Sequence, residues 1–194
     1  MKDARFTLLL VMALSFAGVA NAQDAKPPAP AAATPAGTEP VANPVSSTVK
    51  QQLTRFTKIM VAAAEAMPPE KYNFKPTPEM NTFAHLTMHI TQSNTLLCAK
   101  ISGAAAPDAG TLADTDTKDK LVTALKASFD FCATALANVD DAHLGDPLVL
   151  FGNRPSSRAG ALIGLSDTWN DHYGAQAIYL RLAGILPPTA QPKP

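Results

Sequence analysis

The sequence predicts an all-α protein whose folded part is a four-helix bundle with long connections. Within residues 47–188, four segments repeat apolar residues at every third or fourth position, which is the period of a helix buried along one side. Each segment is roughly 20 residues long, and helices of similar length with one apolar stripe pack most simply as a bundle. A stretch of this size forms one domain around one core.

Residues 1–22 have the features of an export signal. A positively charged start is followed by the apolar run 6–20 and then by Ala20-Asn21-Ala22, the small-residue pattern of a cleavage site. The apolar run is shorter than the about 20 residues that a membrane span needs, and an uncleaved anchor is the alternative. We expect cleavage after Ala22, a periplasmic or secreted product, and no membrane span in that product.

Two segments outside the domain are expected to be disordered. Residues 23–46 consist mainly of Ala, Pro, Thr and small polar residues, and residues 189–194 are similar in composition. Such sequences cannot bury enough apolar surface to offset the entropy lost on ordering. Prolines also favour extended, hydrated chain. We therefore interpret residues 23–46 as a linker and residues 189–194 as a tail.

Capping residues and helix breakers delimit the four expected helices. The candidate N-caps are Ser46 or Ser47, Asn81 or Thr82, Asp116 or Thr117, and Ser156 or Ser157. The candidate stops are Pro68-Pro69, Gly103, Asp140-Asp141, and Gly184 ahead of Pro187-Pro188. Between the third and fourth helices, the segment PLVLFGNRPSS is apolar and then turn-like, which predicts a short strand or an ordered loop.

The balance of charge argues against a nucleic acid partner. Lys and Arg number 16 and Asp and Glu also number 16, so the formal net charge is zero. The sequence has no basic run and no alternation of basic and aromatic residues. Proteins that bind nucleic acids rely on such positive surfaces, so we expect none to bind here. A small-molecule ligand and a homodimer both remain open.

The chain has two cysteines, Cys98 and Cys132, on the second and third expected helices. An exported protein meets an oxidising compartment, where a disulfide can form. Two free thiols buried on facing helices are the alternative, because free cysteine behaves as a small core residue.

Three of the four histidines lie on expected helices. His85 and His89 are four residues apart on the second helix, which places both imidazoles on one face. His172 lies on the inner side of the fourth helix. If these helices are neighbours, two or three ring nitrogens could converge on a divalent ion such as zinc, nickel or iron. The alternative is that they are hydrogen-bonded core residues.

Several motifs together resemble the DinB-like superfamily. The stretch 62–90, with AMPPEKYNFKPTPE and then TMHI, is similar to the junction between the first two helices of that family. The stretch 150–162, LFGNRPSSRAGAL, and the closing segment 170–188, NDHYGAQAIYLRLAGILPP, are also similar, as is the Phe131-Cys132 pair. The resemblance covers almost the whole expected domain.

The resemblance implies an up-down-down-up bundle with a divalent metal held by three histidines. One would come from the second helix and two, four residues apart, from the fourth. His89 matches the first of these positions and His172 matches the last, but the remaining position is Thr168, which is not a normal ligand. His85, one turn from His89, is the candidate third ligand.

The sequence therefore predicts an exported DinB-like protein of unassigned biochemical role that binds a divalent metal between its second and fourth helices. If it is an enzyme, the resemblance implies a metal-dependent hydrolase or thiol transferase, although no catalytic residue can be assigned. The alternative is a non-catalytic envelope binding or stress protein in which the metal site has degenerated.

Overall fold

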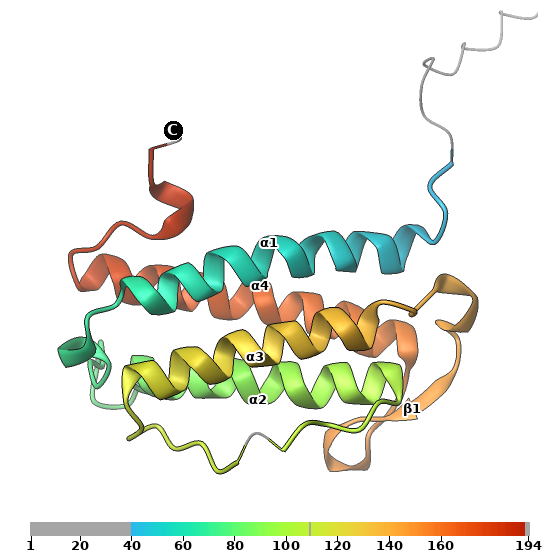
Figure 1. Ribbon diagram of the computed structural model, residues 1–194, viewed down its shortest axis with the longest axis horizontal. Helices are drawn as coiled ribbons and strands as arrows, with labels where there is room; N and C mark the ends of the chain where they lie inside the picture. The colour runs from blue at the N-terminus through green and yellow to red at the C-terminus, as the bar shows by residue number, and fades with distance from the viewer. Residues whose placement is uncertain (1–39, 109, 193–194) are drawn as a thin grey trace, which may run out of the picture. The chain divides into compact units, whose positions relative to one another are not determined.

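The computed structural model describes residues 40–108 and 110–192. The expected signal peptide 1–22 and the linker as far as residue 39 lie outside the described residues, as do residues 193–194. The main elements are four helices, shown in Figure 1. They are α1 (Pro44–Ala66), α2 (Phe83–Ser102), α3 (Lys118–Leu136) and α4 (Arg158–Leu182). Within the described residues, no helix is both long and apolar enough to cross a membrane.

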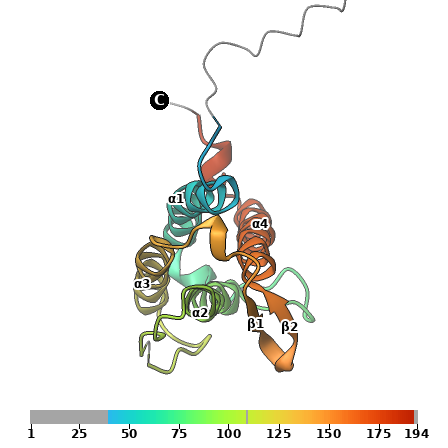
Figure 2. The same cartoon turned by 90° about the vertical axis from the view of Figure 1, so that its right-hand side faces the viewer.

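The helices form an up-down-down-up bundle, as the sequence predicted. Helices α1 and α4 run in one direction, and α2 and α3 run in the other (Figure 1). Each of α1 and α2 packs against both α3 and α4, so α1 and α2 lie at opposite corners (Figure 2). Because α2 and α3 are parallel, the chain must return along the bundle between them. Residues 103–108 and 110–117, called the crossover segment below, belong to this return.

A two-stranded hairpin occupies the connection between α3 and α4. Strand β1 (Pro147–Val149) pairs antiparallel with β2 (Pro155–Ser157), and Leu148 lies opposite Ser156. The connection also contains two short 3-10 helices, η2 (Asp141–His143) and η3 (Phe151–Asn153). The sequence predicted either a short strand or an ordered loop for residues 147–157. The structure has strands at both ends of this segment.

Three of the four helices begin at predicted N-caps. The side-chain oxygen of Thr82 accepts a hydrogen bond from the backbone of His85, and that of Ser157 accepts one from Gly160. Thr117 caps α3 in the same way through the backbone of Lys120. These bonds satisfy donors that a helix cannot pair internally. The left-handed Gly103, at φ 77°, ends α2 as predicted.

Helix α1 begins earlier than predicted, and its cap comes from elsewhere in the chain. The helix starts at Pro44 rather than after Ser46 or Ser47, and Asn43 precedes it in a left-handed conformation at φ 52°. The carboxylate of Asp141 accepts hydrogen bonds from the backbone N–H groups of Val45, at 2.9 Å, and Ser46, at 2.8 Å. A distant acidic residue therefore satisfies this helix end, which also favours negative charge.

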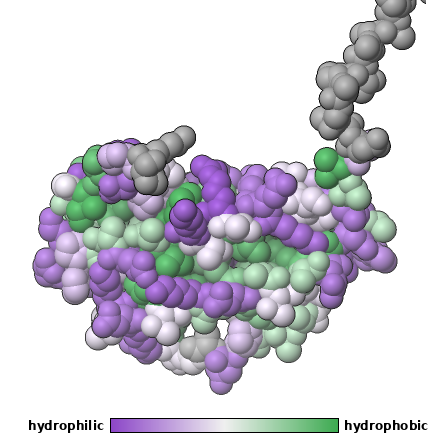
Figure 3. All heavy atoms as spheres, turned by 45° about the horizontal axis from the view of Figure 1, so that its top comes forward, coloured by the Kyte–Doolittle hydropathy of each residue, from purple (hydrophilic) through white to green (hydrophobic). Residues whose placement is uncertain are grey.

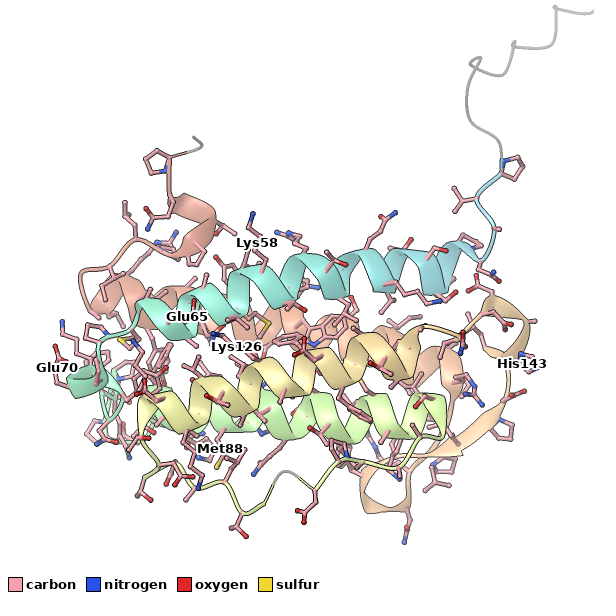
Figure 4. All side chains as sticks on the ribbon, viewed as in Figure 1. Lys58, Glu65, Glu70, Met88, Lys126 and His143 are labelled. Atoms are coloured by element: carbon pink, nitrogen blue, oxygen red, sulfur yellow. A yellow bond between two sulfur atoms is a disulfide. The ribbon has the colours of Figure 1, made fainter. Side chains whose placement is uncertain are left out.

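A basic side chain from another segment also reaches the carboxyl end of every helix. Such contacts pair a cation with the negative end of the helix dipole. The contacts are Lys118 to the carbonyl oxygen of Glu65, Arg158 to Ile101, Lys50 to Ala137 and Val139, and Lys71 to Ala183. Figure 4 also shows Glu65 of α1 beside Lys126 of α3, and their charged groups lie 2.7 Å apart.

The core contains a polar centre among buried aromatic and aliphatic side chains. Trp169 is fully buried, and its indole N–H donates to the side-chain oxygen of Asn94 at 2.7 Å. The amide nitrogen of Asn94 donates in turn to the hydroxyl of Ser128 at 3.1 Å. These three residues belong to α4, α2 and α3. Because each bond joins a different pair of helices, the network specifies how the three pack together.

The two cysteines form a disulfide in the same region. Cys98 of α2 and Cys132 of α3 are fully buried, and their Cα atoms lie 5.3 Å apart. The structure thus decides between the two alternatives left by the sequence. The bond cross-links the parallel helices next to the Asn94 network.

The folded part extends slightly past the predicted end of the domain. A short 3-10 helix, η4 (Pro188–Ala190), follows α4 and contacts α1. The hydroxyl of Tyr173 donates to the side-chain oxygen of Thr189 at 2.8 Å and accepts from its backbone N–H at 3.0 Å. The predicted tail at residues 189–194 therefore begins with residues that pack on the bundle.

On the face in Figure 3, hydrophobic residues occur in small groups between hydrophilic ones.

Candidate metal centre

A cavity between α2 and α4 brings together all three predicted metal ligands. It has a volume of about 420 Å³, and its walls include His85, His89 and His172 together with Asp171 and Tyr179. His85 and His89 come from the first two turns of α2, and His172 comes from the middle of α4. The packing of α2 against α4, which the sequence could only assume, creates this arrangement.

The rings of His89 and His172 lie at a separation that two ligands of one ion can have. Their ring centroids lie 5.0 Å apart, with an angle of 34° between the ring planes. With metal–nitrogen distances of about 2.0 Å and a tetrahedral angle at the ion, the centroids of two imidazoles on one zinc ion lie roughly 5 Å apart. The observed separation therefore fits a shared ion with no movement of either helix.

The hydrogen bond made by His172 leaves one ring nitrogen free. Its Nδ1 lies 2.6 Å from the backbone oxygen of Thr168, one turn earlier on α4. A carbonyl oxygen can only accept, so Nδ1 carries the proton and the lone pair is on Nε2. In metal-binding histidines, the ring nitrogen that does not face the metal commonly donates a hydrogen bond of this kind, which fixes the orientation of the ring. The Asp171 carboxylate, 3.8 Å from the same Nδ1, is too distant to compete.

His89 is exposed, and its surroundings favour the neutral imidazole. Partial loss of hydration lowers the pKa of His89, and the neighbouring His172 and His85 lower it further when they carry positive charge. A neutral ring has a lone pair to offer a metal, whereas a protonated ring does not. The lowered pKa therefore favours the neutral ring of His89 at neutral pH.

His85 does not point at the same centre as the other two. Its ring centroid lies 6.4 Å from that of His89, and the two rings are almost parallel, at 10°. This separation would need the two nitrogens to face each other in a nearly straight line through the ion, which a tetrahedral site does not allow. The Nδ1 of His85 lies 3.5 Å from the carboxylate of Asp114 in the crossover segment. His85 would have to rotate to become a ligand.

The position expected to hold the third histidine is Thr168, whose neutral hydroxyl is not a normal metal ligand. The hydroxyl of Thr168 donates to the backbone oxygen of Gly164, one turn back on α4, at 2.8 Å. In residues 40–108 and 110–192, no group of three or more His, Cys, Asp or Glu side chains is arranged to hold a metal ion. The candidate centre consists of two neighbouring histidine rings, with a third histidine one turn away on α2.

Asp114, Glu79 and Asn81 are polar neighbours of the site that the sequence did not assign to it. Asp114 lies more than 20 residues after His89 in the chain, in a connection whose path no local pattern predicts. Its carboxylate reaches His85 because the crossover segment returns along α2 (Figure 1). The up-down-down-up order, which requires this return, was the only indirect signal.

The comparisons agree with this fold. Residues 52–168 match the DinB superfamily, a span that includes His85 and His89 and ends before His172. A DinB-like protein from Bacillus subtilis has a similar structure, with a TM-score of 0.60 and 21% identity. The alignment covers 75% of this chain and 99% of that one. No curated protein sequence matches the chain.

Two further solved structures have the same fold. For a DinB-like protein from Bacillus cereus, the TM-score is 0.61 at 19% identity, covering 73% of this chain and 95% of that one. For a conserved protein from Enterococcus faecalis, the TM-score is 0.54 at 19% identity, covering 71% and 95%. Since the sequence match spans more than half of the chain, the chain belongs to the DinB superfamily.

Proposed function

We propose that this protein is exported and binds a divalent metal ion between α2 and α4 through His89 and His172. The observation that carries the proposal is the 5.0 Å separation of their ring centroids, with Nδ1 of His172 engaged by the Thr168 carbonyl. Two neutral imidazoles at this spacing favour zinc, nickel or iron over magnesium or calcium, which prefer oxygen ligands.

His85 is the proposed third ligand. It lies in the same cavity, one turn from His89, and rotation about its side-chain bonds would bring a nitrogen toward the centre. In its observed conformation, Nδ1 of His85 lies 3.5 Å from the carboxylate of Asp114, and this rotation would change that contact. This arrangement would replace the histidine that the resemblance placed at position 168.

Any catalysis at this site would depend on the open coordination positions. A bound divalent ion with such positions lowers the pKa of a coordinated water or thiol and supplies a nucleophile. The residues of the chain would bind the ion, and the 420 Å³ cavity would hold a small substrate beside Asp171 and Tyr179. A metal-dependent hydrolase or thiol transferase is the corresponding class of enzyme.

Two observations support export to an oxidising compartment. The first is the signal-like sequence at residues 1–22. The second is the Cys98–Cys132 disulfide, a bond that is rare in reducing compartments. Periplasmic or secreted protein would meet metal ions outside the buffering of the cytoplasm.

The alternative function is a non-catalytic envelope binding or stress protein with a degenerate site. Thr168 favours it, since its hydroxyl is engaged by its own helix and leaves only two converging ligands. In that case, His89 and His172 would only pack between the helices.

Metal content separates the two functions. The protein is produced with its signal, recovered from the periplasm without a histidine tag, and measured by elemental mass spectrometry beside His89→Ala and His172→Ala. Near one equivalent of zinc, nickel or iron in the wild type, lost in both variants, supports the proposed site. No metal in the wild type, even after dialysis against excess ion, would establish the degenerate alternative.

A further inference from the structure

We propose that the protein has a second binding site, for a small, uncharged and mainly apolar molecule, beneath the crossover segment. A cavity of about 570 Å³ lies between α2, α3 and this segment, a volume typical of small-molecule sites. It shares no lining residue with the histidine cavity. The proposal therefore does not depend on metal binding.

The cavity exists because small side chains face a connection that does not fill the space. On α3, Ala124 and Ala127 line it beside the larger Phe131. The crossover segment passes over the groove between α2 and α3, on the side of the bundle away from α1 and α4 (Figure 2). The space is a groove open to solvent along α3, where Thr123 and Ala127 are exposed, and the buried Thr91 and Ser128 form its floor.

Three hydroxyls in the helical walls are already paired, which favours an apolar ligand, while the exposed Asp119 and Thr123 lie at the edge of the cavity. The hydroxyls of Thr91 and Thr95 donate to carbonyl oxygens one turn back on α2, both at 3.0 Å. The hydroxyl of Ser128 donates to the backbone of Leu125 at 2.7 Å. A polar ligand would lose its hydration here without gaining replacement hydrogen bonds. An apolar molecule loses nothing and is removed from water.

Three charged residues line the rim, Asp108, Asp119 and Lys120, and contacts within the chain engage two of them. The carboxylate of Asp108 accepts a hydrogen bond from the backbone N–H of Gly110 at 3.0 Å. The ammonium group of Lys120 lies 2.8 Å from the carboxylate of Asp116, and it also donates to the backbone oxygen of Thr111 at 3.4 Å. The lysine therefore fastens the crossover segment to α3 instead of presenting a free charge to a ligand. An anionic ligand would have to displace Asp116.

The crossover segment is attached at its ends and spans the cavity between them. At its start, the backbone N–H of Ala104 donates to the hydroxyl of Ser102, and near its end that of Ala113 donates to Asp116. Between these points, Leu112 lines the main cavity and also a neighbouring one of about 260 Å³. Displacement of this leucine by a ligand would join the two spaces while the ends stay attached.

Fluorescence titration with N-phenyl-1-naphthylamine tests the proposal. This uncharged dye becomes bright in apolar surroundings, and it is added to the full mature chain with the disulfide intact. Saturable binding of one dye per chain is expected. Ala127→Phe fills the cavity and should weaken binding about tenfold or more. The control is Ala133→Phe, an exposed position on the same helix that lines neither cavity, and it should bind like the wild type.

A second variant keeps the test decisive if Ala127→Phe fails to fold. Leu112→Asp places a carboxylate in the crossover segment, outside the helical core, and should weaken dye binding to a similar extent. Loss of affinity in either folded variant, with the control unchanged, supports the site. The proposal is overturned if the wild type shows no saturable binding. It is also overturned if the folded variants bind as the wild type does, which would place the dye on exposed residues such as Ile178 and Leu182.

Discussion

The backbone oxygen of Thr168 lies 2.6 Å from Nδ1 of His172 and fixes which ring nitrogen of that histidine carries the proton. Thr168 replaces the histidine that the family resemblance implies at this position. Its backbone oxygen nevertheless orients the ring of His172. Since the bond uses only the backbone of Thr168, a different side chain at this position would leave it intact. The position can be changed to test the site without disturbing His172.

Thr168→His should convert the site into a stronger one. The new imidazole would lie one turn from His172 on α4 and provide the third nitrogen that the family resemblance implies. Zinc affinity should rise roughly 100-fold, because a third ligand closes the site around the ion. Competition with a chromophoric chelator measures the change.

The matched control adds an imidazole on the same helix but away from the cavity. Asn170 is exposed and lies two residues from position 168, which places it near the opposite face of α4. Asn170→His should leave the affinity unchanged. Equal gains in both variants would mean that the added histidine binds zinc on the surface and that the site is wrongly placed.

His89 should titrate below the ordinary histidine range in the metal-free protein. Partial loss of hydration is the largest cause of its lowered pKa, and positive charge on His172 is the next. In His172→Gln, the pKa of His89 should therefore move up, though not fully back to 6.5. NMR titration of the ring protons in both proteins measures this shift.

The lowered pKa also sets the direction of the pH effects. A folded-state pKa below the unfolded value means that the unfolded chain binds more protons, so the contribution of His89 to stability falls as pH falls below the ordinary histidine range. Metal affinity should fall in the same direction, since protons compete for the same nitrogen. Zinc binding that strengthens between pH 7 and pH 5 would contradict the assignment of His89.

The sequence predicted much of this site because its main features are local. The i, i+4 spacing of His85 and His89 already places both rings on one face of α2, and the side of α4 that holds His172 follows from the helical period. What the sequence could not show was ring orientation. Only the structure shows that the ring of His89 lies 5.0 Å from that of His172, while the ring of His85 lies parallel to that of His89, beside Asp114.

The disulfide should contribute measurably to stability. Cys98 and Cys132 are separated by 34 residues in the chain, and closing a loop of this length in the unfolded state stabilises the fold by about 3–4 kcal/mol in the chain-entropy model. The double variant Cys98→Ala with Cys132→Ala should lose about this amount in chemical denaturation. Thiol counting in denaturant without reductant should find no free thiol in wild-type protein from the periplasm. Two free thiols there would contradict the bond.

Lys50→Met should destabilise the bundle through the end of α3. The ammonium group donates to the backbone oxygens of Ala137, at 2.9 Å, and Val139, at 2.8 Å, where α3 ends. Loss of these charge-assisted bonds should cost about 1 kcal/mol, and the difference should shrink at high salt. The control is Lys58→Met, an exposed lysine on the same helix (Figure 4). Equal losses in both variants would show a general effect of charge and no specific cap.

The start of α1 shows where local sequence rules fail. Ser46 and Ser47 are good N-cap residues, yet the helix begins at Pro44 because Asp141, 95 residues beyond Ser46, accepts hydrogen bonds from its first N–H groups. By contrast, Thr82, Thr117 and Ser157 cap their helices as predicted, because each bond is made within three residues. The number and order of helices followed from local patterns, whereas contacts between distant segments did not.

The most direct test of the central claim is a zinc titration of the mature, tag-free protein beside the double variant His89→Ala with His172→Ala. Isothermal calorimetry measures both stoichiometry and affinity, and circular dichroism confirms that the variant keeps its helices. The account predicts one zinc ion per wild-type chain and no saturable binding in the variant. Saturable binding of equal strength in both proteins, or none in the wild type, would show that α2 and α4 do not form a metal site.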